Sequence, residues 1–84
     1  MTRPLLLLTV LLRIVVLSPD GKPVHDAAVF CGSELNLTDS AGVWICDVEP
    51  GPLLVRVSAP TFQPWEGSIR VSERGARLTV RLKH

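Results

Sequence analysis

The residues that could do chemistry in this 84-residue sequence are few, namely two histidines, two cysteines and no tyrosine. His25 is followed directly by Asp26, and neighbouring side chains on a strand point to opposite faces, so we do not expect a local acid–base pair there. The other histidine is His84, far along the chain. No serine has an evident histidine base, and no Gly-rich loop precedes a helix. The sequence therefore predicts no catalytic residue and no enzyme.

Metal and cofactor sites are not predicted either. Carboxylates concentrate between residues 20 and 49, but their spacing does not match a calcium loop, and no Cys/His cluster suits zinc. Cys31 and Cys46 are the two cysteines, and an even count is compatible with one disulfide. The same count is compatible with two buried thiols that behave as small hydrophobic side chains. Both interpretations of the pair stay open.

Length and composition point to one folded domain. Hydrophobic residues supply 46% of the chain and charged residues 20%, with a formal net charge of +1. This balance excludes a disordered tail and disfavours a nucleic-acid-binding protein, which usually carries a strongly basic surplus. We predict a single domain over 1–84, divided into an apolar N-terminal arm or strand extension (1–9) and a core (10–84).

The elements that would position these residues are strands. Apolar and polar side chains alternate with a period of two over 43–48, 53–58, 68–72 and 77–82. Turn-forming residues separate these runs at 18–21, 38–42, 49–52 and 73–75. No stretch shows an amphipathic helix. The pattern predicts an all-β protein, a sandwich or a barrel.

A series of short motifs follows in order: Ser18-Pro-Asp-Gly-Lys-Pro-Val24, Ala27-Ala-Val29, Thr38-Asp-Ser-Ala-Gly-Val-Trp44, Glu49-Pro-Gly51 and Val55-Arg-Val-Ser-Ala-Pro-Thr-Phe62. The series resembles a carboxypeptidase regulatory-like domain. The resemblance implies an antiparallel, transthyretin-like (Ig-like) sandwich of about seven strands, without catalytic residues, in an extracellular or cell-surface protein. If inward and outward positions alternate along the strands as they do in that family, Cys31 and Cys46 face the same interior. A disulfide between them is then geometrically feasible.

Glycines and two departures from the family pattern mark the turns. Gly21, Gly42 and Gly51 fall where turns are expected to need positive φ. Asp26 and Thr61 stand where the family usually has glycine, so the form of the turn before Phe62 is left in question. Asn36-Leu-Thr38 also matches a glycosylation sequon, a triplet that often arises by chance.

The segment Leu5–Leu17 is almost wholly apolar. It is too short for a membrane span, which needs about 20 apolar residues, and we favour an uncleaved strand over a signal-peptide remnant. We expect a long edge strand with one face in the core and a second face that needs cover. The alternatives are that 1–9 folds back within the monomer, or that a missing partner covers this face. The second face is the candidate interface. With the inward and outward positions of the resembled family, it comprises Leu5, Leu7, Leu11, Val15 and Leu17.

Two aromatic residues, Phe62 and Trp65, flank Gln63-Pro64 in a predicted loop and are candidate ligand contacts, since an exposed ring can stack on a sugar. Taken together, we expect a non-enzymatic structural module that self-assembles, as a homo-oligomer, filament or tubule, through its apolar N-terminal strand. The alternatives are a carbohydrate-binding or adhesion module with a polysaccharide partner, and a small accessory domain that docks on a larger protein. Neither a nucleic acid nor a transmembrane span is expected.

Overall fold

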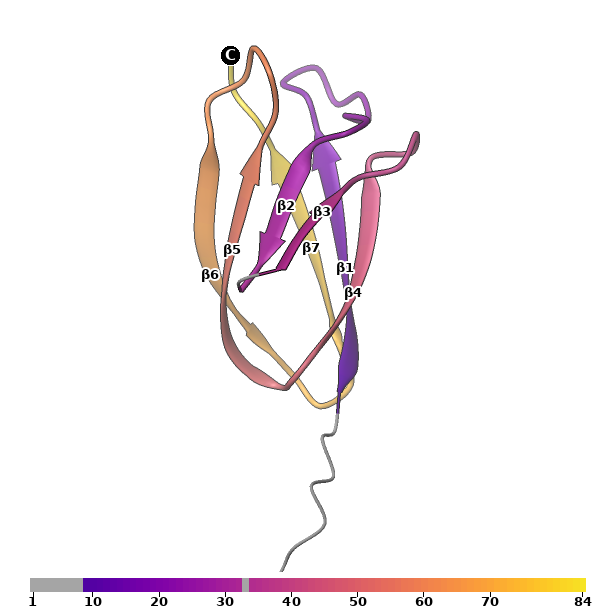
Figure 1. The fold of residues 1–84 in the computed structure, drawn as a ribbon, viewed down its shortest axis with the longest axis vertical. Coiled ribbons are helices and arrows are strands. Elements are labelled where there is room, and N and C mark those ends of the chain that lie inside the picture. Colours follow the sequence, from indigo (N-terminus) through magenta and orange to yellow (C-terminus); the bar gives the residue numbers. More distant parts are fainter. Residues whose placement is uncertain (1–8, 33) are drawn as a thin grey trace, which may run out of the picture.

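The computed structural model describes residues 9–32 and 34–84, and within these ranges seven strands form two sheets packed face to face (Figure 1). The predicted all-β sandwich is confirmed. The strands, in chain order, are β1 (Val10–Leu17), β2 (Ala28–Cys31), β3 (Glu34–Leu37), β4 (Val43–Val48), β5 (Gly51–Ser58), β6 (Trp65–Val71) and β7 (Ala76–Arg81). Among the described residues, no helix is long and apolar enough to span a bilayer.

The two sheets have the strand orders β4-β1-β7 and β3-β2-β5-β6. Every neighbouring pair is antiparallel except one, because β1 runs parallel to β7 with Leu12 opposite Ala76 and Leu17 opposite Arg81. The expectation of a fully antiparallel sandwich is therefore wrong at this pair. Parallel neighbours cannot be joined by a hairpin, and here the chain crosses through five intervening strands before β7 returns beside β1.

The apolar strand β1 lies in the centre of its sheet. Its backbone pairs with β4 on one side, from Val10 opposite Val48 to Val15 opposite Val43, and with β7 on the other. The expectation of an open edge strand is wrong, because both rows of backbone hydrogen-bonding groups of β1 already have partners within the chain. The hydrophobicity of β1 matches a strand between two neighbours in a two-layer fold.

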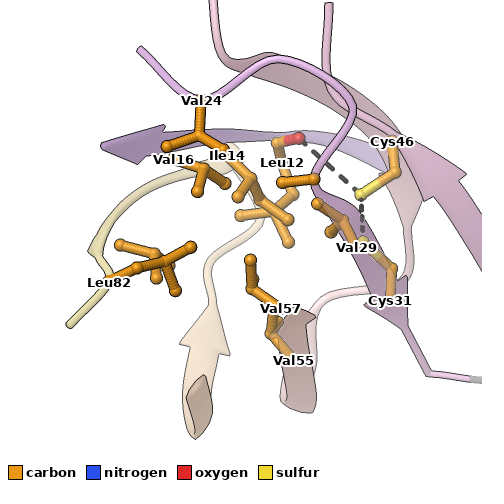
Figure 2. Packing of buried hydrophobic residues seen from close by; sticks show 12 residues of the cluster. Leu12, Ile14, Val16, Val24, Val29, Cys31, Cys46, Val55, Val57 and Leu82 are labelled. Atoms are coloured by element: carbon orange, nitrogen blue, oxygen red, sulfur yellow. Dashed lines mark hydrogen bonds between the residues drawn. The ribbon is translucent and has the colours of Figure 1, made fainter. Parts of the chain in front are cut away.

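The core lies between the sheets, where the inward positions of the alternating strands meet (Figure 2). Leu12, Ile14 and Val16 of β1 are fully buried, whereas Arg13 and Val15 between them are exposed and half-buried on the other face. The same period of two places Val55 and Val57 of β5 inside. Burial of one such aliphatic side chain contributes about 1.5–3 kcal/mol, so the alternation itself selects this register.

The turns use positive φ at the predicted glycines, Gly21, Gly42 and Gly51. Gly42 has φ +74°, and a Cβ there would lie 2.7 Å from the carbonyl oxygen of Val16, so only glycine fits. Two residues other than glycine also have positive φ, Asp26 at +60° and Thr61 at +72°. The turn before Phe62 thus keeps a left-handed residue although threonine occupies the position.

Candidate functional site

The two cysteines meet in the core, where the sheets face each other. Cys31 ends β2 of one sheet and Cys46 lies within β4 of the other. Both are buried free thiols, their Sγ atoms are 2.8 Å apart, and Cys46 Sγ also lies 3.8 Å from the carbonyl oxygen of Leu12 (Figure 2). This is the most chemically distinctive contact among the described residues, and it joins the two layers of the sandwich.

The thiol–thiol contact changes the acidity of both groups. A hydrogen bond from Cys46 lowers the pKa of the Cys31 thiol, although burial opposes this effect. The same hydrogen bond, together with burial and nearby negative charge, strongly raises the pKa of Cys46. Cys31 is therefore the sulfur that more readily becomes a thiolate, and Cys46 is the one that keeps its proton.

Trp65 and Phe62, the predicted ligand contacts, are both half-buried and pack against the core. Trp65 is the first residue of β6 rather than a loop residue, and its indole lies over Gly67, where an added Cβ would come within 2.6 Å of Cη2. Phe62 stacks on the His84 imidazole, with ring centroids 5.0 Å apart. Contact of either ring with a ligand stays a prediction.

Two shallow hollows flank Trp65. One, of about 260 Å³, is lined by Trp65 with Phe30, Arg56 and Glu66, among others. In it, Arg56 Nε lies 3.9 Å from Glu66 Oε1, and both side chains are exposed, so this ion pair adds little stability. The other hollow, of about 270 Å³, lies between the start of β6 and residues 81–83. Both hollows are partly open to solvent, and charged side chains line them, Arg56 and Glu66 in the first and Glu66, Arg81 and Lys83 in the second.

The prediction that His25 and Asp26 point to opposite faces is wrong. Their side chains do not point to opposite faces, since His25 Nε2 lies 3.3 Å from Asp26 Oδ1. The reason is that both residues lie in a turn before β2, where Asp26 has φ +60°, and the alternation of a strand does not apply. Both side chains are exposed, and none of the interactions found among the described residues brings a nucleophile to the pair.

Two residues of the candidate interface, Leu5 and Leu7, lie outside the described residues. Leu11 is 59% exposed on the outer face of its sheet, whereas Val15 and Leu17 are half-buried. Ile45 of β4 is exposed beside Leu11, as its diagonal neighbour across the β1–β4 pair.

Three further exposed leucines lie on the other sheet and were not among the predicted contact residues. Leu35 and Leu37 lie on β3, a short strand that was not predicted, and Leu54 lies on β5. The alternation of Leu35 and Leu37 around the half-buried Asn36 was the available signal for this strand. Asn36, the first residue of the sequon triplet, therefore lies on β3, and Thr38, its third residue, follows the strand and is buried.

Comparison with known proteins identifies similar folds but no family. No protein-family model matches the chain, and no curated protein matches its sequence. Among solved structures, the chain is similar to mercury-inhibited catechol 1,2-dioxygenase from Acinetobacter sp. ADP1, with a TM-score of 0.71 and 11% identity over 90% of this chain and 52% of the other. It is also similar to 3-chlorocatechol 1,2-dioxygenase from Rhodococcus opacus 1CP, with a TM-score of 0.60 and 8% identity over 89% of this chain and 58% of the other.

The chain thus spans about half the length of the dioxygenases whose fold it shares. This finding overturns the expectation of a structural module that self-assembles through its N-terminal strand, since the similar structures are catechol dioxygenases. The physical basis of that expectation fails as well, because β1 is a central strand with both edges paired.

Proposed function

We propose that this chain serves as a β-sandwich domain of the catechol-dioxygenase type that acts as a scaffold and has no oxygen-activating centre of its own in residues 9–32 and 34–84. The observation that carries the proposal is the similarity of the two-sheet sandwich to catechol 1,2-dioxygenase over 90% of this chain, at a TM-score of 0.71. At 11% identity the fold is shared while the side chains that do chemistry are free to differ.

The donor set supports a scaffold rather than a reaction centre. Proteins carry out chemistry on dioxygen with a redox metal or an organic cofactor. In the described part of the chain no group of three or more His, Cys, Asp or Glu side chains is placed to hold a metal ion. The two thiols contact each other in the core, and the hollows beside Trp65 contain no such group. These residues do not fit a redox metal.

The test is an assay for catechol oxidation by the purified full chain. The chain is incubated with ferrous or ferric iron, desalted, and examined for bound iron by elemental analysis and for oxygen uptake with catechol. A catechol 1,2-dioxygenase treated in the same way is the positive control. We expect no stoichiometric iron and no oxygen uptake above the iron blank. Stoichiometric iron with catechol-dependent oxygen uptake would overturn the proposal.

We also propose that the sandwich is of the carboxypeptidase regulatory-like, transthyretin-like kind. Its support lies in the turns, because Asp26 and Thr61 adopt positive φ at the two positions where that family usually has glycine. Substitution of Thr61 by glycine tests this support, since a turn suited to glycine should become more stable.

A protein partner, either a second copy or a larger protein, is a further proposal. Its support is the apolar pair of Leu11 and Ile45 on the outer face of one sheet and the exposed leucines of the other. Sedimentation of the chain at several concentrations measures self-association directly. A mass that rises with concentration in the wild type and not in Leu11→Lys supports a second copy, and a concentration-independent monomer mass excludes it.

A further inference from the structure

Cys31 and Cys46 join two elements that no backbone hydrogen bond connects. Cys31 belongs to the sheet β3-β2-β5-β6 and Cys46 to the sheet β4-β1-β7, and both side chains point into the space between them (Figure 2). The two residues are 15 positions apart in the sequence. A covalent bond here would link the two layers directly.

We propose that Cys31 and Cys46 form an oxidation site, in which a hydroperoxide converts the two thiols into a disulfide that fastens β2 to β4. The separation of the sulfurs carries this proposal. They are 2.8 Å apart. A disulfide bond is about 2.05 Å long, so each sulfur needs to move by only about 0.4 Å.

Metal binding by the same pair is disfavoured by the same distance. Tetrahedral zinc with Zn–S bonds of about 2.3 Å holds its sulfurs about 3.8 Å apart, so the thiols would have to separate within a close-packed core. Zinc also needs further ligands, and the described residues include no third His, Cys, Asp or Glu side chain placed to complete a metal site with the pair. The geometry of the pair therefore favours a bond between the two sulfurs over coordination of a metal ion.

The two sulfurs have different roles in the reaction. The lowered pKa of Cys31 and the raised pKa of Cys46 make Cys31 the first nucleophile. Cys31 is also the more exposed residue of the two, at 9% against 5%. It ends β2 beside the short edge strand β3, so a local opening of this hairpin admits a small oxidant.

The chemistry balances in two steps. The Cys31 thiolate attacks one oxygen of hydrogen peroxide, an S–O bond forms, the O–O bond breaks, and the hydroxide that leaves takes up the proton released by the Cys31 thiol as water. The Cys46 sulfur then attacks Cys31 Sγ, the S–S bond forms, the S–O bond breaks, and the leaving hydroxide takes up the Cys46 proton as water. Overall, two thiols are oxidised by two electrons to a disulfide, and one peroxide is reduced to two water molecules.

The first experiment treats the reduced full chain with hydrogen peroxide and measures three properties. We expect an intact mass that falls by two hydrogen atoms, a single peptide pair linked through Cys31 and Cys46, and protection of both residues from alkylation after unfolding. Closure of a loop of this size should raise the melting temperature by roughly 10–20 °C, reversibly with a thiol reductant. Cys31→Ala and Cys46→Ala should each abolish the shift.

The second experiment separates the roles of the sulfurs. A cyclic dione that traps sulfenic acids should label Cys31 in the Cys46→Ala variant and should not label Cys46 in Cys31→Ala. The wild-type chain itself decides the main claim, whatever the variants do to folding. The proposal is overturned if both thiols remain free after peroxide treatment of the folded chain, if oxidation stops at a sulfinic acid, or if the disulfides join separate chains.

Discussion

The hydroxyl of Thr38 donates a 2.6 Å hydrogen bond to the backbone carbonyl of Val24, although neither residue belongs to a strand. The same oxygen accepts a 2.9 Å hydrogen bond from the N–H of Ala27. Thr38 is only 2% exposed. One side chain therefore satisfies two backbone groups of the segment between β1 and β2 and holds that segment against the turn that precedes β4.

Thr38→Val is expected to lower the free energy of unfolding by at least about 2 kcal/mol, because it leaves a buried donor and a buried acceptor unpaired in a side chain of the same shape. Thr38→Ser is the matched control, since it keeps the hydroxyl and removes one methyl group, at a cost near 1 kcal/mol. Urea unfolding followed by circular dichroism measures both. Equal losses in the two variants would show that packing, rather than the hydrogen bonds, gives Thr38 its importance.

Thr61 has φ +72°, a conformation that strains a β-branched residue. Thr61→Gly should therefore raise the free energy of unfolding, by about 1 kcal/mol after the greater flexibility of the unfolded chain is counted. Thr79→Gly on the exposed face of β7 is the control and should destabilise the protein, because that position is an ordinary strand conformation. A loss of stability in both variants would contradict strain at Thr61.

The sequence predicted the faces of the strands better than their neighbours. For β1, the resemblance to the family placed Leu11, Val15 and Leu17 on the second face and so Leu12, Ile14 and Val16 inside, where they lie. The alternation of side chains carried no information on which strands pair, because every residue offers the same backbone hydrogen-bonding groups whatever its side chain. The central position of β1 between β4 and β7, and its parallel pairing with β7, were therefore beyond reach.

At the candidate site, too, the sequence predicted which way side chains face but not which residues meet. Parity placed Cys31 and Cys46 in a common interior, but their 2.8 Å contact depends on how the two sheets stack, which no local pattern encodes. His25 and Asp26 were assigned to opposite faces because a strand was assumed there, and the left-handed turn at Asp26 brings the side chains together instead. Local patterns fail where the chain leaves its regular elements.

Asp20 provides a test of pH dependence. The Ser18 hydroxyl donates a 2.6 Å hydrogen bond to Asp20 Oδ1, and this bond is the main reason that the pKa of the Asp20 carboxyl is below its usual value. Because the pKa is depressed in the folded chain, the stabilisation is present above the pKa of the unfolded chain and is lost as the pH falls through that of the folded chain.

NMR titration of the Asp20 carboxyl should therefore give a higher pKa in Ser18→Ala than in the wild type. The acid limb of the stability curve of this variant should lose the part of its slope that comes from Asp20. Ser68→Ala, on the exposed face of β6, is the control and should leave the pKa of Asp20 unchanged. An unchanged pKa in Ser18→Ala would assign the depression to the backbone or to Lys22 instead.

Leu11 and Leu12 are adjacent leucines of the central strand with opposite environments, since Leu11 is 59% exposed and Leu12 is fully buried. Leu12→Ala should lower the free energy of unfolding by about 2–5 kcal/mol, because it removes buried methyl groups and leaves a cavity between the sheets. Leu11→Ala should change it by no more than about 0.5 kcal/mol in the monomer, since the side chain already meets water. Chemical unfolding at low protein concentration compares the two. Similar losses would mean that another surface covers Leu11 even under these conditions, whereas a small effect at low concentration that grows with protein concentration would identify that surface as a second copy of the chain.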